Sequence, residues 1–211
     1  MKIVLRILML AAIATLVYMC IQSVLSPISF DKLKKEREKA ISERLIAIRS
    51  AQIGFRNMNG KYAGTYEELQ KFLNEVKIPF LVKEGELSDD QLKAGITEKE
   101  AVKKGIIRRD TLWVLAKDTL LEKNFDVASI GKVPGFEQTS FTLDTATITS
   151  VSGYTVPVFE ATVQFDVYLN DLDKQILINL KDKEKKLNHF TGLKVGSVKE
   201  INNNAGNWEQ F

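Results

Sequence analysis

The sequence is poor in the residues on which most metal sites and disulfide-stabilised domains depend. It contains one cysteine, Cys20, and one histidine, His189, among 211 residues. A single cysteine excludes an internal disulfide framework, and this pair of residues cannot form a Cys/His cluster for zinc. With 12 glycines and four prolines, the composition is neither collagen-like nor that of a proline-rich low-complexity segment. We therefore expect a fold that is stabilised by an ordinary hydrophobic core.

The loops that bind nucleotides or present a hydrolase nucleophile are also missing. No G-x-x-x-x-G-K-[ST], G-x-G-x-x-G or G-x-S-x-G pattern occurs. Asp171 and Asp173 form a D-x-D pair that resembles a metal-binding motif, but a turn explains these residues better. His189 lies beside a turn, where a surface position is more common than a role as a general base. We predict no catalytic, cofactor-binding or metal-ligating residue, and hence no enzyme; Asp171 and Asp173 are the best enzymatic alternative.

One long apolar run is present near the N-terminus. Residues 7–25 contain no charged side chain, and these 19 residues would span roughly 28 Å as a helix, close to the thickness of a bilayer core. Pro27 follows the run, at a place where a helix can end or bend. We predict a retained membrane anchor over residues 1–30. A cleaved signal peptide and a lipoprotein modified at Cys20 remain alternatives, although neither has the small residues that its cleavage site needs.

The charge distribution bears on the membrane orientation and on nucleic-acid binding. The formal net charge is +3, from 30 basic and 27 acidic residues. Only Lys2 and Arg6 of the basic residues precede Asp31, and no acidic residue does, so the remainder carries 28 basic and 27 acidic residues. A nearly neutral domain gives no reason to expect a nucleic-acid partner. A strict count of flanking charges favours a cytoplasmic domain, but long domains translocate largely regardless of their charge. We expect an inner-membrane protein with its domain in the periplasm.

A helical stalk is predicted over residues 31–60. Its first nine residues are too polar to bury, and the apolar residues that follow recur in steps of three and four, which makes one stripe along a helix. Asn59-Gly60 then predicts the helix end, because glycine is the usual residue after a helix C-terminus. The stripe either packs against the protein's own sheet, which we favour, or lines an assembly seam. Its members are Ile41, Leu45, Ile48, Ala51, Phe55 and Met58.

Residues 61–211 are predicted to form one α+β domain that packs against helix 41–58. Capping boxes begin helices at Thr65 and Thr97, residues 89–92 add a helical turn, and Gly153 lies in a hairpin turn. Beyond residue 110 the chain becomes rich in β-branched and aromatic residues, which favours a mostly antiparallel sheet with short helices. The predicted strands cover residues 111–116, 140–149, 155–168, 175–180 and 193–198.

Trp208 lies in an asparagine-rich C-terminal segment, residues 202–208. Tryptophan is enriched at protein interfaces, so Trp208 is a candidate anchor for a partner. It can equally fold back and cover the protein's own sheet, which we favour.

Two resemblances bear on function. The apolar run, the helix to Asn59 and the Asn-Gly-Lys-Tyr turn at residues 59–62 resemble type IV pilins and pseudopilins in outline, although the Gly-Phe processing site of those proteins is missing. The segments N-G-K-Y-A-G-T-Y-E-E-L, V-P-V-F-E-A and G-L-K-V-G-S-V-K-E resemble those of uncharacterised single-pass membrane proteins of Bacteroidota. The second resemblance implies an envelope protein without implying an activity.

These observations predict a membrane-anchored, non-enzymatic envelope protein that makes protein–protein contacts. A pilin-like or scaffold subunit of a trans-envelope assembly fits them, with the membrane bound through residues 7–25. The alternative is a membrane-tethered binding domain for a small ligand or a cell-wall component, which would require a deep pocket with convergent polar groups. The candidate partner contacts are Ile41, Leu45, Ile48, Phe55 and Trp208.

Overall fold

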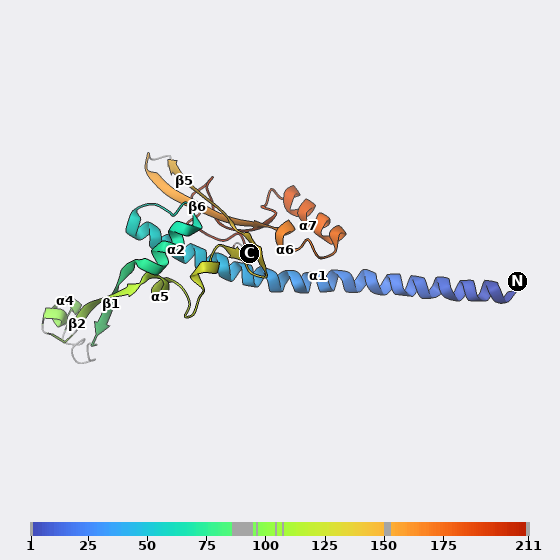
Figure 1. The fold of residues 1–211 in the computed structure, drawn as a ribbon, viewed down its shortest axis with the longest axis horizontal. Helices are drawn as coiled ribbons and strands as arrows, with labels where there is room; N and C mark the ends of the chain where they lie inside the picture. The colour runs from blue at the N-terminus through green and yellow to red at the C-terminus, as the bar shows by residue number, and fades with distance from the viewer. Residues whose placement is uncertain are drawn as a thin grey trace. The chain divides into compact units, whose positions relative to one another are not determined.

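The computed structural model describes residues 2–85, 95, 97–103, 105–106, 108–149 and 153–209. The fold is α+β, with a long N-terminal helix and small antiparallel sheets, as the sequence predicts (Figure 1). The chain divides into two compact units. The first combines Met1–Arg49 with Gly131–Phe211, and the second is Ser50–Ile130. The predicted division into an anchor, a stalk and a soluble domain describes roles at a membrane and stays a prediction.

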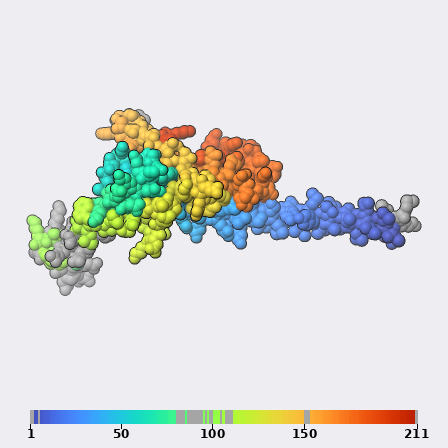
Figure 2. Space-filling model, viewed as in Figure 1, coloured from blue at the N-terminus to red at the C-terminus, as the bar shows by residue number. Residues whose placement is uncertain are grey.

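Helix α1 (Lys2–Asn59) begins with a segment that is long and apolar enough to cross a membrane. A signal sequence near the N-terminus has the same length and composition. The large apolar side chains between Ile7 and Leu25 are each more than half exposed, and Figure 2 shows this part of the helix uncovered. Cys20 is a free, exposed cysteine within this segment.

Pro27 lies inside helix α1, so of the two outcomes that the sequence allowed there, an end or a bend, the helix end does not occur. A proline inside a helix removes one backbone hydrogen bond and costs about 3 kcal/mol. The helical turns on both sides still make their own bonds, and Phe30, one turn further on, is buried. Packing after Pro27 therefore holds the chain in the helix that the proline alone would disfavour.

The predicted stripe along α1 is buried over most of its length. Ile41, Leu45, Ile48 and Ala51 have no exposed area. Met58, by contrast, is 47% exposed, so its assignment to the buried stripe is wrong. It lies on the last turn, where the helix gives way to a loop that leaves its side chain uncovered. The helix ends as predicted at Gly60, whose φ of 75° favours glycine and whose N–H donates to the carbonyl of Arg56 at 2.8 Å.

The described residues of the unit Ser50–Ile130 include two helices with threonine caps and a β-ladder. Thr65 caps α2 (Tyr66–Glu75) by accepting a hydrogen bond from the Glu68 N–H. Thr97 and Glu100 form the reciprocal bonds of a capping box at α4 (Glu98–Lys103). Both predicted helix starts are confirmed, whereas the predicted turn at residues 89–92 lies outside the described residues. The remaining elements are β1 (Lys77–Glu84), β2 (Arg108–Leu115), α5 (Ala116–Leu120) and η1 (Val127–Ser129).

Strand β1 is an element that the sequence analysis missed. It contains Pro79, which lies opposite Trp113 in the antiparallel ladder with β2. Proline lacks the N–H that a central strand must donate, but an edge strand tolerates it. Within the described residues the ladder has two strands, so each strand keeps one edge without a neighbouring strand.

The other unit contains the larger sheet, with strand order β5-β6-β7. The strands β5 (Thr142–Thr149), β6 (Thr155–Gln164) and β7 (Gly192–Gly196) pair antiparallel, and Gly153, with φ of 83°, lies in the connection between the first two. Strands β3 (Lys132–Val133) and β4 (Phe136–Ser140) form a separate ladder. Phe159, Ala161 and Val195 have no exposed area and form the centre of the sheet's buried face.

Two predicted strand segments are helical. Residues 165–168 form α6 (Phe165–Tyr168), and residues 175–180 belong to α7 (Lys174–Lys186), so the predicted strand at 175–180 is wrong. Asp173 begins α7, because its carboxylate accepts hydrogen bonds from the N–H groups of Gln175 and Ile176. In Figure 1, α6 and α7 lie beside the middle of α1.

Candidate functional site

Three of the five predicted partner-contact residues are buried in the structure. Ile41, Leu45 and Ile48 have no exposed area and are part of the packed interior. Phe55 is half-buried, and its ring meets that of Phe72 edge-on with centroids 5.2 Å apart. Trp208 is half-buried on the other unit. Only Phe55 and Trp208 offer area to a partner in this conformation, and their role in partner contacts stays a prediction.

The C-terminal segment folds back along β7 and positions Trp208. Asn207 and Lys194 exchange two hydrogen bonds of 3.0 Å, and Gly196 N–H donates to the carbonyl of Ala205 at 3.1 Å. Gly206 forms a β-bridge with Val195. A Cβ atom added at Gly206 would lie 2.6 Å from the Trp208 indole, so the absence of a side chain there lets the ring pack on the backbone.

An ion pair ties this segment to α1. Arg49 Nη1 lies 2.8 and 3.0 Å from the two carboxylate oxygens of Glu209. Glu209 also accepts a hydrogen bond from the Gly206 N–H at 3.0 Å. This bond, followed by the one from Arg49, lowers the pKa of the Glu209 carboxyl. The residues on either side of Trp208 are therefore held in place.

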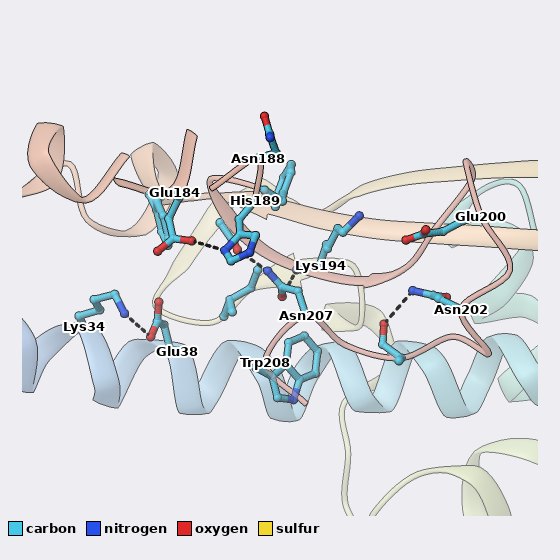
Figure 3. Close-up of a pocket in the computed structure, with 15 residues that line it drawn as sticks. Lys34, Glu38, Glu184, Asn188, His189, Lys194, Glu200, Asn202, Asn207 and Trp208 are labelled. Atoms are coloured by element: carbon cyan, nitrogen blue, oxygen red, sulfur yellow. Dashed lines mark hydrogen bonds and ion pairs between the residues drawn. The ribbon is translucent and has the colours of Figure 1, made fainter. Parts of the chain in front are cut away.

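A pocket of about 420 Å³ lies beside Trp208, between α1, the end of α7, and β7 with its C-terminal segment (Figure 3). We call it the tail pocket. Its aromatic walls come from Phe165, Phe190 and Trp208. Asn188, Asn202 and Asn207 contribute amides. Its charged and titratable members are Lys34, Glu38, Glu184, His189, Lys194 and Glu200.

Most charges of the tail pocket are paired. Lys34 Nζ lies 2.9 Å from Glu38, and His189 Nδ1 lies 3.0 Å from Glu184. Tyr168 Oη donates to the other oxygen of Glu38 at 3.1 Å. Burial of the Tyr168 ring raises the pKa of its hydroxyl, and the negative charge of Glu38 raises it further. Tyr168 therefore stays a neutral donor that orients the Glu38 carboxylate.

A second ion pair, near the pocket, holds α1 against the loop before α7. The Arg37 guanidinium donates to both carboxylate oxygens of Asp171, at 2.6 and 2.7 Å, and also to the carbonyl of Tyr168. The Arg37 head lies 5.3 Å from the centre of the Phe136 ring. These bonds raise the pKa of Arg37 and lower that of Asp171.

The two aspartates of the D-x-D pair have separate structural contacts. Asp171 pairs with Arg37, while Asp173 caps α7 and accepts a hydrogen bond from Ser26 Oγ at 2.9 Å. Among the described residues, no three or more His, Cys, Asp or Glu side chains lie together as metal ligands would.

Sequence reasoning missed Arg37, Arg49 and Glu209. Arg37 lies in a stretch of interleaved charges that is typical of a solvated helix face, and Glu209 lies near the chain end. Their partners are 134 and 160 residues away in the sequence, so no local pattern indicates them. In the sequence, the unusual asparagine-rich run before Trp208 draws attention to the C-terminal segment but does not indicate its partners.

No protein-family model, curated protein or solved structure matches this chain.

Proposed function

We propose that the protein is a single-pass, non-enzymatic envelope protein whose domain lies outside the cytoplasm and makes protein–protein contacts. In this proposal it is a pilin-like or scaffold subunit of a trans-envelope assembly. The observation that carries the proposal is the continuity of α1, which runs from the uncovered apolar segment past Pro27 to Asn59.

A continuous helix would couple the domain mechanically to its anchor. Arg37 and Arg49 tie α1 to the loop before α7 and to the C-terminal segment, 12 residues or about 18 Å apart along the helix. Two such attachments, together with the buried stripe, resist rotation of the helix within its unit. A rigid connection of this kind suits a protein that must present its domain at a fixed distance and angle.

Membrane retention is the first test of this proposal. Full-length protein should stay in the membrane pellet after alkaline extraction, and its intact mass should include residues 1–25. Leu16→Arg, at the middle of the apolar run, should make insertion less favourable by about 3–4 kcal/mol. Leu187→Arg is a matched control, because Leu187 is also about half exposed but lies outside the run. Recovery of a soluble chain that begins after residue 25 would refute the anchor.

Protein contacts are the second test. A photo-crosslinking amino acid at Phe55 or at Trp208 should yield discrete crosslinked products in native membranes. The same amino acid at Lys123, an exposed residue of a turn, should yield none. If all three positions give only uncrosslinked monomer, the contact function is wrong.

A second candidate function, a membrane-tethered binding domain, is favoured by the tail pocket. Its volume of about 420 Å³ falls within the range of about 300–1,000 Å³ of small-molecule sites. Its amide and charged side chains supply the convergent polar groups that we expect of such a binding domain.

A further inference from the structure

We propose that the tail pocket binds a polyhydroxylated ligand, a saccharide, held outside the lipid headgroup layer. This inference rests on the second candidate function, the binding domain, and specifies the chemistry of its ligand.

Hydrogen-bond donors and acceptors are mixed around the tail pocket. Lys34 and Lys194 offer ammonium donors, whereas Glu38, Glu184 and Glu200 offer carboxylate acceptors. A sugar hydroxyl both donates and accepts, so it can bond to either kind of group. A strongly anionic or cationic ligand would instead meet repulsive charges on part of the wall, at close range.

Several of these charged groups already bond to other side chains of the protein. Lys34 pairs with Glu38, His189 with Glu184, and Lys194 with Glu160 at 3.5 Å. Each lysine is matched by a carboxylate, and the paired groups keep lone pairs and N–H groups that a neutral ligand can use. These paired groups are therefore better suited to hydroxyls than to an ion.

The indole of Trp208 forms part of the pocket wall. Trp208 is half-buried and fixed by the contacts of Gly206 and Glu209 on either side of it. A rigid indole costs little conformational entropy on binding, and its flat apolar face complements the C–H face of a pyranose ring. Figure 3 shows the ring beside α1, with Asn207 and Lys194 above it.

The position of the pocket on α1 excludes an ordinary phospholipid headgroup as the natural ligand. Lys34 and Glu38 lie nine and 13 residues beyond Leu25 on the same helix, which places them about 14–20 Å past the apolar run. Headgroups extend only about 5–8 Å beyond the hydrocarbon core on each side. Even a helix tilted by 40° would keep these residues about 10 Å or more from the core. The ligand is therefore a free or cell-wall saccharide, or a glycan long enough to rise above the headgroups.

The experiment uses full-length protein in phosphatidylcholine nanodiscs. The chain has two tryptophans, so Trp113→Phe leaves Trp208 as the sole indole reporter. Maltotriose, cellotriose and chitotriose are titrated while Trp208 emission is followed, with inorganic phosphate and spermidine as ionic probes. Ligand-observed NMR measures the same sugars with Trp208→Ala and with Glu200→Gln. A further arm compares nanodiscs that contain a monoglucosyl diacylglycerol.

We expect at least one trisaccharide to shift Trp208 emission with a dissociation constant in the millimolar range or below. Trp208→Ala should weaken this binding about tenfold or more, whereas Glu200→Gln, which keeps a polar group, should weaken it only about two- to threefold. The monoglucosyl lipid should not compete, because its single ring stays within the headgroup layer.

Three other outcomes would overturn the inference in distinguishable ways. Binding of only phosphate or spermidine, lost in Trp208→Ala, would leave the binding domain standing and refute the saccharide. Competition by the monoglucosyl lipid would refute the position outside the headgroups. No response to any probe, or sugar binding that Trp208→Ala leaves unchanged, would refute both the saccharide and the pocket as a binding site.

Discussion

Gln52 is the buried polar residue on which the end of α1 depends. Its side chain has no exposed area, and both ends of its amide bond to Ala63: Nε2 donates to the carbonyl at 3.0 Å, and Oε1 accepts from the N–H at 2.9 Å. The amide thus mimics a strand partner for one residue of the loop after α1. Loss of one member of such a pair leaves buried polar groups without partners.

Gln52→Ala should therefore destabilise the protein by about 2–4 kcal/mol, since the N–H and C=O of Ala63 would both lose their partner. Urea denaturation followed by circular dichroism measures this loss. Gln70→Ala is a matched control, because Gln70 is less buried and makes one bond, to the carbonyl of Ala128. We expect it to cost about 1 kcal/mol. Equal losses in the two variants would contradict the argument.

The planar shape of the Arg37 guanidinium contributes to its ion pair in addition to its charge. Arg37→Lys keeps the positive charge but loses the planar fork that meets both oxygens of Asp171. We expect a loss of about 1–2 kcal/mol in thermal or urea denaturation, reduced from a fully buried pair because Asp171 is exposed. In an Asp171→Asn background the same substitution should cost less. Lys35→Ala, on the exposed side of the helix, should have little effect.

Among the elements, the two helices that begin with a threonine capping box were the most predictable. Thr65-Glu68 and Thr97-Glu100 are local pairs, three residues apart, so the sequence alone carries the whole interaction. The same was true of Gly60, whose positive φ is local backbone geometry.

Thr65→Ala should cost about 1 kcal/mol, because it removes the acceptor for the Glu68 N–H at the start of α2. Amide hydrogen exchange should show the loss first in the initial turn of α2. Thr65→Ser keeps the hydroxyl and should exchange almost as slowly as the parent protein. Equally fast exchange in both variants would show that the cap is not responsible.

Helix α7 shows where element prediction failed. The run from Ile176 to Leu180 is rich in residues that favour strands, and Asn170-Asp171 looked like a turn between two strands. Two facts outside that pattern decide for a helix. The carboxylate of Asp173 caps it. Residues 176, 177 and 180 are the less exposed positions, whereas Ile178 and Asn179 are exposed, which is the spacing of one helix face. Strand propensity mainly expresses how a side chain fits its neighbours, and those neighbours were unknown.

At the scale of the whole molecule, three carboxyl groups with lowered pKa values make the free energy of unfolding depend on pH in the acid range. The pKa of Asp171 is lowered by the bond from Arg37, that of Asp173 by the Ile176 N–H and then by Ser26, and that of Glu209 by the Gly206 N–H and then by Arg49. A carboxyl with a lower pKa in the folded state contributes stability above its unfolded pKa, about 4, and loses it as the pH falls through the folded value.

Stability should therefore be constant near neutral pH and fall below about pH 4. The double variant Asp171→Asn/Glu209→Gln should be less stable at pH 7 but should lose less on acidification, so that the two stability curves converge. Urea midpoints measured from pH 7 to pH 2.5 test this. Parallel curves would mean that other carboxyl groups dominate.

The sequence by itself determined the features that local chemistry controls. These are the uncharged apolar run, the two helix starts at threonine capping boxes and the end of α1 at Gly60. Each depends on residues within a few positions of one another or on a continuous composition. Nothing beyond the sequence was needed to find them.

Only the tertiary structure decided the continuity of α1 through Pro27, the helical state of residues 174–186 and the assembly of the tail pocket. The tertiary structure also joins residues more than 100 positions apart, such as Arg37 with Asp171 and Arg49 with Glu209. Proline at residue 27 and strand-forming residues at 176–180 express local preferences worth a few kcal/mol at most. Packing and ion pairs across the fold outweigh them, and such contacts leave no periodic trace in the sequence.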